Sequence, residues 1–155
     1  MILFHGSDTD ITSIDLTKCR PYKDFGKGFY LTTIKDHAEQ MALKVAARNS
    51  REPVVCCFDF DLDAAIGNGI IIKEFYDENE EWAKFVYSNR EIPSFKHNYD
   101  IVIGGIADDG LREQFFSIKS GLIGFKELAE NIKFELDNIQ YCFCTEKSLK
   151  YLRKI

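Results

Sequence analysis

Residues 24–32 read Asp-Phe-Gly-Lys-Gly-Phe-Tyr-Leu-Thr, with two glycines two positions apart in front of a short aromatic segment. Glycine at such a place lets the backbone bend close to a ligand. The aromatic segment predicts a strand over 29–31, in which Tyr30 points to the opposite face from Phe29 and Leu31. If Phe29 and Leu31 face the core, Tyr30 is free to stack on a planar heterocycle. A hairpin turn followed by a half-buried tyrosine fits the same pattern.

A second motif, His5-Gly6-Ser7, stands where the first predicted strand, residues 1–4, ends. A histidine there can donate and accept hydrogen bonds to a ribose diol. The adjacent glycine leaves its backbone N–H and C=O open to a flat amide, and the serine adds a hydroxyl. A structural or surface histidine is the alternative. The stretch 6–28 that joins the two motifs is long for a structureless loop, which indicates a functional loop.

Further strands and helices are predicted around these motifs. Apolar runs predict strands over 53–60, 70–75, 99–103 and 139–143. Helical periodicity and capping residues predict helices that begin at Thr32 or Thr33, near residue 78, at Asp108 or Asp109, at Gly124, and at Thr145, the last one turning Leu149 and Leu152 inward. Because strands and helices are interspersed without regular β-α-β alternation, we expect an α+β fold. It would be a split, curved sheet with flanking helices, in a single domain over 1–155.

The composition narrows the class of protein. The chain has 155 residues, close to the common size of one domain. Its net charge is −5 and it has no dense basic run, which argues against a tight, general nucleic-acid binder. The sequence has no charged-then-apolar leader and no apolar run of about 20 residues, so we expect a cytoplasmic protein without a membrane span.

Five cysteines occur, at positions 19, 56, 57, 142 and 144, and no Cys-x-x-Cys pair is present. Cys142 and Cys144 would share one face of a strand, but no second pair of ligands at zinc spacing accompanies them. We expect reduced thiols that serve as small apolar residues, and no metal site.

The two motifs together resemble a known arrangement. A His-Gly at the end of the first strand, followed about 25 residues later by Gly-x-Gly-x-Tyr-x-Thr, is similar to the nicotinamide-binding half of the ADP-ribosyltransferase superfamily, in its His–Tyr branch. Residues 3–42 look closer still to a small bacterial family assigned to that superfamily. The resemblance continues through 82–90, 99–109 and 140–152. It implies the split, curved sheet of that superfamily and NAD⁺ as the co-substrate.

The resemblance also implies a role for each residue of the two motifs. His5 would bind a ribose hydroxyl of NAD⁺, Gly6 would bracket the nicotinamide carboxamide through its backbone, and Ser7 would assist. Tyr30 would stack on the nicotinamide ring, and Gly28 would shape the mouth of the pocket.

Two cations near these motifs have possible roles as well. Lys27 would lie at the mouth of the same pocket. Arg20, in the loop between the motifs, would meet the pyrophosphate, because guanidinium groups pair well with phosphate.

A third position, on the late strand, departs from the usual pattern. Cleavage of the nicotinamide–ribose bond builds positive charge on the ribose, and superfamily members commonly place a Glu there to stabilise that charge. Here the matching residue is Gln140. A neutral amide can still accept from the 2′-hydroxyl and orient the ribose, so Gln140, His5 and Tyr30 form the expected catalytic set. Glu146 and Glu113 are the alternative carboxylates.

The resemblance therefore predicts a mono-ADP-ribosyltransferase that moves ADP-ribose from NAD⁺ to a macromolecular acceptor, protein or nucleic acid. The small size fits the toxin of a bacterial toxin–antitoxin pair, with an antitoxin protein as a possible partner. Two alternatives stay open. One is a module that binds NAD⁺ or ADP-ribose with little catalysis, suggested by Gln140, and the other is an NAD⁺ glycohydrolase with water as the acceptor.

Overall fold

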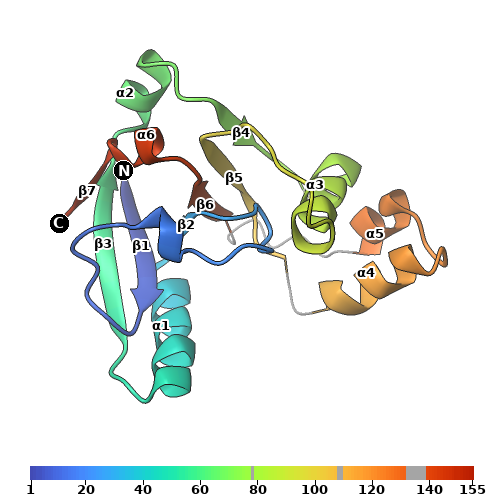
Figure 1. The fold of residues 1–155 in the computed structure, drawn as a ribbon, viewed down its shortest axis with the longest axis horizontal. Helices are drawn as coiled ribbons and strands as arrows, with labels where there is room; N and C mark the ends of the chain where they lie inside the picture. Colours follow the sequence, from blue (N-terminus) through green and yellow to red (C-terminus); the bar gives the residue numbers. More distant parts are fainter. Residues whose placement is uncertain (78, 108–109, 132–138) are drawn as a thin grey trace.

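Seven strands form one open, mixed sheet in the order β4-β5-β6-β2-β1-β3-β7 (Figure 1). The computed structural model describes residues 1–77, 79–107, 110–131 and 139–155. The strands are β1 (Ile2–Ser7), β2 (Phe29–Thr32), β3 (Val54–Phe60), β4 (Ile72–Glu74), β5 (Ile101–Gly105), β6 (Ile139–Phe143) and β7 (Leu152–Lys154). The helices are α1 (Lys35–Asn49), α2 (Leu62–Gly67), α3 (Glu80–Glu91), α4 (Leu111–Lys119), α5 (Phe125–Asn131) and α6 (Glu146–Leu149), with one 3₁₀ turn at Leu16–Lys18. Among the strand pairs of these described residues, β4 and β5 run parallel and the others run antiparallel.

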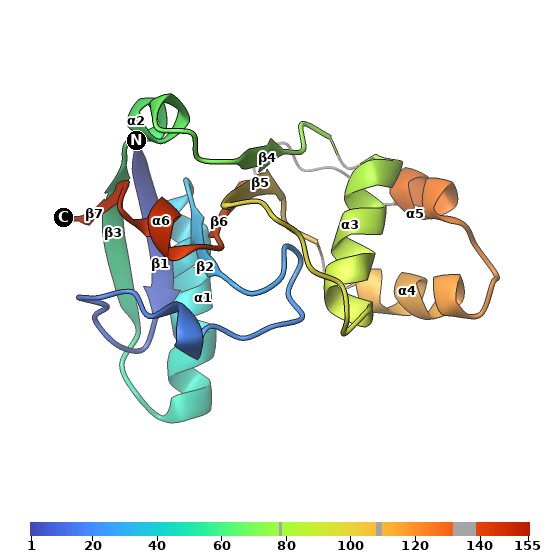
Figure 2. The same ribbon diagram turned by 45° about the horizontal axis from the view of Figure 1, so that its top comes forward.

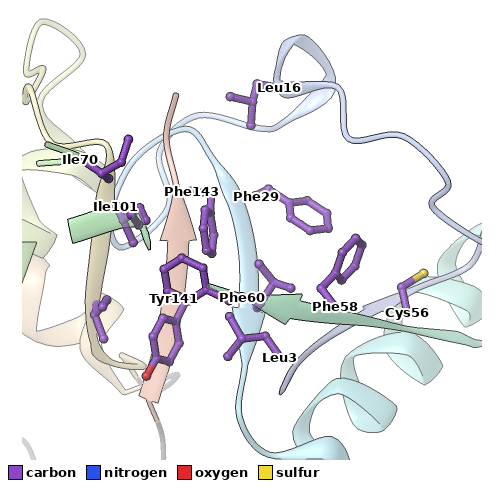
Figure 3. Close-up of a cluster of buried hydrophobic side chains, with 13 residues drawn as sticks. Leu3, Leu16, Phe29, Cys56, Phe58, Phe60, Ile70, Ile101, Tyr141 and Phe143 are labelled. Atoms are coloured by element: carbon purple, nitrogen blue, oxygen red, sulfur yellow. The ribbon is translucent and has the colours of Figure 1, made fainter. Parts of the chain in front are cut away.

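One face of the sheet carries a core built largely from aromatic side chains (Figure 3). Strand β3 shows why this face is buried, because its burial alternates along the strand, with Cys56, Phe58 and Phe60 turned inward. Rings from β2 and β6 join them: Phe29, for example, meets Phe58 edge to face at 5.5 Å between ring centroids. Leu31 lies in the same core, so Phe29 and Leu31 both face inward, which is the condition under which Tyr30 is free to stack on a ligand.

The opposite face is covered by helices. Helix α1 lies along β1 and β3, while α3, α4 and α5 gather at the other end of the molecule, beyond β5 (Figures 1 and 2). A second apolar core lies between the sheet and helices α3, α4 and α5. Its largest buried member is Trp82 on α3, which packs with Val102 of β5, Leu111 of α4 and Cys142 of β6.

The α+β class is confirmed, and so is Thr145 as a cap, since its hydroxyl oxygen accepts from the Ser148 amide at 3.4 Å. The predicted terminal helix is wrong beyond Leu149, where α6 ends. The chain turns there into β7, which pairs with β3 from Phe58↔Lys154 to Phe60↔Leu152. Strand β3 would otherwise leave its outer backbone groups unpaired, so the sheet edge overrides the helical pattern.

One predicted helix start, that of α1, differs from the structure, and another, that of α4, cannot be compared with it. The cap of α1 is Ile34, whereas Thr32 belongs to β2 and accepts from the Ile34 amide at 3.1 Å. Asp108 and Asp109, predicted as caps of α4, lie outside the described residues. Within those residues, no helix is both long and apolar enough to cross a membrane.

Candidate functional site

Strands β1 and β2 share only a very short antiparallel ladder of backbone pairs. Strand β1 pairs with β3 at six positions but with β2 at only one, Phe4↔Thr32. Backbone groups of successive strand residues point alternately to the two neighbouring strands. The Met1 carbonyl accepts from the Phe60 amide on the β3 side, so by alternation Phe4 and Gly6 present their N–H and C=O toward β2. In the described part of the chain, Gly6 therefore has no ladder partner there.

His5 occupies the place where the ladder would continue. The register would next pair Gly6 with Tyr30, yet the Tyr30 carbonyl oxygen lies 2.7 Å from Nδ1 of His5. A carbonyl only accepts, so Nδ1 carries the hydrogen and Nε2 is the acceptor. Burial lowers the pKa of His5, which favours this neutral form. The Tyr30 carbonyl is thus taken by His5, and the buried Gly6 keeps an unpaired backbone N–H and C=O toward β2, beside an acceptor nitrogen. We call this unpaired stretch of the ladder the β1–β2 opening.

Gly6 also has a packing role. A Cβ at this position would lie 2.0 Å from the Ala38 carbonyl oxygen and 2.6 Å from the Ala42 amide nitrogen. Helix α1 can rest directly on β1 only because residue 6 has no side chain. Next to it, Ser7 is half-buried and its hydroxyl oxygen accepts from the Thr9 amide at 3.3 Å.

Tyr30 points to the face opposite Phe29, as predicted, and its hydroxyl is fully engaged. It accepts from the Phe25 amide at 3.0 Å and donates to the Gly26 carbonyl at 2.7 Å. Burial raises the pKa of Tyr30 well above its usual value of 10, so the hydroxyl stays protonated. Lys23 Nζ lies 4.8 Å from the ring centroid. The hydroxyl closes the 25–30 turn, which leaves the half-buried ring as the part that can meet a ligand.

Gly28 is required by the sheet. A Cβ there would lie 2.5 Å from the Cys142 sulfur and 2.7 Å from the Phe143 carbonyl oxygen. The glycine therefore lets β2 and β6 approach closely, immediately before Tyr30 pairs with Cys142. Of the two cations named from the sequence, Lys27 is exposed at the rim of a neighbouring pocket, and Arg20 is exposed in the preceding loop.

Gln140 belongs to a buried polar network. Its Nε2 donates to Asp24 Oδ2 at 2.8 Å and to the Gly105 carbonyl at 3.2 Å. Both partners are acceptors, so the orientation of the amide is fixed. Asp24 also accepts from Arg90 Nε at 2.7 Å and from the Ala107 amide at 3.1 Å. The Gln140 side chain is thus fixed by its hydrogen bond to the Asp24 carboxylate, which is itself paired with Arg90.

Asp24 and Arg90 received no role from the sequence. They lie 66 positions apart, and no local spacing signals that they pair. Asp24 is 6% exposed. A buried carboxylate that contacts one guanidinium, one amide and one backbone N–H is a strong organising feature, and only the folded sheet reveals it.

The structure brings only part of the predicted catalytic set together. Residues opposite one another on neighbouring strands share a face. Thr32 opposes Gln140 and Tyr30 opposes Cys142, so Tyr30 and Gln140 lie on the same face. His5 lies on the other face, where its ring packs on Phe29 with 4.3 Å between centroids. A ligand that touches all three would therefore have to reach both faces of the sheet, where β1 and β2 are unpaired.

The alternative carboxylates lie on helices instead of the sheet. Glu146 is exposed in the first turn of α6, directly after the Thr145 cap, where it complements the helix dipole. Glu113 is exposed in the first turn of α4. No contact of either carboxylate with His5, Tyr30 or Gln140 is found among the described residues.

A pocket of about 520 Å³ lies beside the 21–27 loop. Tyr22, Lys27, His97, Tyr99 and Cys144 are among its lining residues, whereas His5, Tyr30 and Gln140 are not. His97 Nε2 donates to the Phe25 carbonyl at 2.9 Å, and its Nδ1 accepts from the Tyr99 amide. The pocket is therefore a separate feature that shares one loop with the β1–β2 opening. The described residues contain no group of three or more side chains arranged to hold a metal ion.

A family model described as "Protein of unknown function (DUF3990)" matches residues 1–154. No curated protein and no solved structure matches the chain.

Proposed function

We propose that this chain, which belongs to the DUF3990 family, binds NAD⁺ at the β1–β2 opening and acts as a mono-ADP-ribosyltransferase. The observation that carries the proposal is the unpaired backbone edge of Gly6, held open by the hydrogen bond from His5 to the Tyr30 carbonyl. The transfer to a macromolecular acceptor, and a toxin role opposed by an antitoxin, are part of this proposal and rest on the sequence resemblance.

The edge of Gly6 suits a primary carboxamide. Such an amide carries a donor and an acceptor side by side, and so does the backbone of a single residue. Nicotinamide could then bond twice to Gly6, with its ring against the half-buried ring of Tyr30. The neutral His5 offers Nε2 as an acceptor for a ribose hydroxyl, which a protonated histidine could not do.

Gln140 would serve as the polar group for the ribose. Both amide hydrogens of Gln140 are directed at Asp24 and Gly105, so its carbonyl oxygen is the atom that would meet the 2′-hydroxyl. The hydrogen bond to a carboxylate polarises the amide and increases the negative charge on that oxygen. This arrangement supplies part of the stabilisation that a Glu would give to the developing cation.

The same network favours a second candidate function, a module that binds NAD⁺ or ADP-ribose with little turnover. Gln140 carries no net charge, and Asp24 behind it is already paired with Arg90. The charge available to stabilise an oxocarbenium-like ribose is therefore small, whereas the contacts that bind nicotinamide are unaffected.

The test is nicotinamide release from NAD⁺ by the pure protein, with and without cell lysate as a source of acceptors. We compare wild type with His5→Ala, Gln140→Ala and Tyr30→Leu, and with Tyr76→Leu as the matched control, since Tyr76 is 83% exposed. Thermal unfolding of each variant establishes that it is folded. Labelling of lysate components with ADP-ribose separates transfer from glycohydrolysis.

Release that falls at least tenfold in His5→Ala and Gln140→Ala, but not in Tyr76→Leu, supports the transferase. NAD⁺ binding by calorimetry without release selects the binding module. Wild-type protein that neither binds NAD⁺ nor releases nicotinamide overturns the proposal.

A further inference from the structure

Cys142 and Cys144 form a close sulfur pair at the end of β6. Their Sγ atoms lie 3.4 Å apart, and Cys144 Sγ also lies 3.5 Å from the Cys142 carbonyl oxygen. A disulfide has a bond of about 2.05 Å, so closure needs an approach of only about 1.4 Å. The pair lies where β6 ends, and the Cys144 amide is anchored to the Asp100 carbonyl at 2.8 Å.

The two sulfurs differ in access. Cys142 is fully buried in the helix-covered core, opposite Tyr30 and directly beneath Gly28. Cys144 is only partly buried and lines the 520 Å³ pocket together with His97. A small reagent that enters the pocket can therefore reach Cys144 but not Cys142.

They also differ in protonation. The Cys142 thiol donates to Cys144 and lowers the pKa of the Cys144 thiol to about 6, with a smaller contribution from His97 and against the effect of burial. Burial raises the pKa of Cys142 well above its usual value. At neutral pH the accessible sulfur is thus a thiolate, which is the reactive form, and the buried sulfur is a thiol.

We propose that Cys142 and Cys144 are a redox site that a small hydroperoxide converts into an intramolecular disulfide. In the first step the Cys144 thiolate attacks the peroxide oxygen, the O–O bond breaks, and with one proton the products are a Cys144 sulfenic acid and an alcohol, or water from hydrogen peroxide. In the second step the Cys142 sulfur attacks the sulfenic sulfur and the S–OH bond breaks. The Cys142 proton leaves with the hydroxide as water. Two thiols are oxidised and one peroxide is reduced.

This site is independent of NAD⁺ chemistry, and it is placed to act on the same region. Disulfide closure must move the Cys142 sulfur, which lies under Gly28 and faces Tyr30. The remaining cysteines offer no such pair. Cys56, for instance, bonds to the backbone of the 9–11 loop on the opposite face, where its sulfur accepts from the Ile11 amide at 3.3 Å.

The experiment treats folded, reduced protein with one equivalent of hydrogen peroxide, blocks free thiols with N-ethylmaleimide, and digests with trypsin. The peptide 134–147 carries Cys142 and Cys144 and no other cysteine. We expect this peptide to lose two hydrogens and to take up no maleimide, and to recover two maleimides after dithiothreitol. Peptides with Cys19, Cys56 and Cys57 are the internal controls and should stay fully labelled.

Two variants separate the steps. Cys142→Ser should stop at the sulfenic acid, trapped on Cys144 by dimedone, and Cys144→Ser should show no oxidation in this peptide. Because Cys142 is buried, thermal unfolding must first show that Cys142→Ser is folded. The mass of the wild-type peptide tests the disulfide even if this variant does not fold. Two maleimides on the wild-type peptide after peroxide, or equal oxidation of the control cysteines, would overturn the redox site.

Discussion

Gln140 donates its side-chain amide to the carboxylate of Asp24, 116 positions away in the sequence, over 2.8 Å. Asp24 is held in turn by Arg90 and the Ala107 amide. This contact gives a structural reason for an amide at position 140, where the sequence resemblance implies a carboxylate. A Glu side chain would place its oxygens against two acceptors, Asp24 Oδ2 and the Gly105 carbonyl.

Gln140→Glu should therefore destabilise the fold without raising activity. Loss of two hydrogen bonds and the approach of two buried carboxylates should lower the free energy of unfolding by about 2–4 kcal/mol at pH 7. Urea unfolding measures the change. Gln40→Glu, on the exposed side of α1, is the control and should change stability by less than about 0.5 kcal/mol. Equal stability of Gln140→Glu and wild type would show that the network does not hold position 140.

Arg90→Met should be more damaging, because it leaves Asp24 buried and unpaired. Removal of one partner from a buried ion pair costs about 3–5 kcal/mol, and the Asp24 side chain is 8% exposed. Arg112→Met, at an exposed position of α4, is the matched control. If both variants unfold at the same urea concentration as wild type, the ion pair contributes nothing measurable.

Gly6→Ala should disrupt the packing of helix α1 on strand β1. The added methyl group would lie 2.0 Å from the Ala38 backbone, where no flexible side chain can move aside. Backbone displacement or overpacking of this kind costs about 1–3 kcal/mol or more. Gly67→Ala, with no atom within 4 Å of the new Cβ, is the control and should be neutral or slightly stabilising. A wild-type melting temperature for Gly6→Ala would contradict the direct contact between α1 and β1.

Tyr30→Phe should separate the ring from the hydroxyl. The hydroxyl bonds to Phe25 and Gly26, so its loss should reduce stability by about 1–2 kcal/mol. The ring remains, so NAD⁺ affinity should change less than threefold. Tyr30→Leu removes both and should weaken NAD⁺ binding at least tenfold. Calorimetric titration of the two variants makes the comparison, and equal affinities would remove Tyr30 from the proposed nicotinamide contact.

Alkylation of Cys144 by iodoacetamide should depend on pH in an unusual range. Only the thiolate reacts, so its rate should rise with pH and reach half of its maximum near pH 6. Cys142 and, to a smaller extent, His97 lower the pKa of Cys144, whereas burial and, more weakly, Asp100 raise it, so His97→Ala should move the midpoint to higher pH. Burial raises the pKa of Cys19, which serves as the slow internal reference. A Cys144 midpoint near pH 9 would contradict the thiolate assignment.

The same shift affects stability with a defined sign. The folded-state pKa of Cys144 lies below that of an unfolded cysteine, so the thiolate stabilises the folded state above the unfolded pKa. This contribution should disappear as pH falls through about 6. Comparison of wild type with Cys144→Ser by urea unfolding at several pH values isolates the contribution.

Several features of the fold could be predicted from local sequence alone, because periodicity and turn chemistry act over a few residues. The strand 139–143 has the predicted bounds, the Thr145 cap is present, and Tyr30 faces away from Phe29 and Leu31. These properties depend on alternation along one strand or on one hydroxyl next to one helix end. The α+β class followed from the order of such segments.

Contacts between distant segments could not be read in the same way, since they depend on which strands become neighbours in the sheet. Leu152 belongs to a strand because β3 offered an open edge, although its spacing suited a helix. Asp24 meets Gln140 and Arg90, and the β1–β2 ladder ends at Phe4, only because strands from three parts of the chain lie side by side. Local periodicity is the same for every strand order, so the long-range hydrogen bonds that build the candidate site appear only in the assembled sheet.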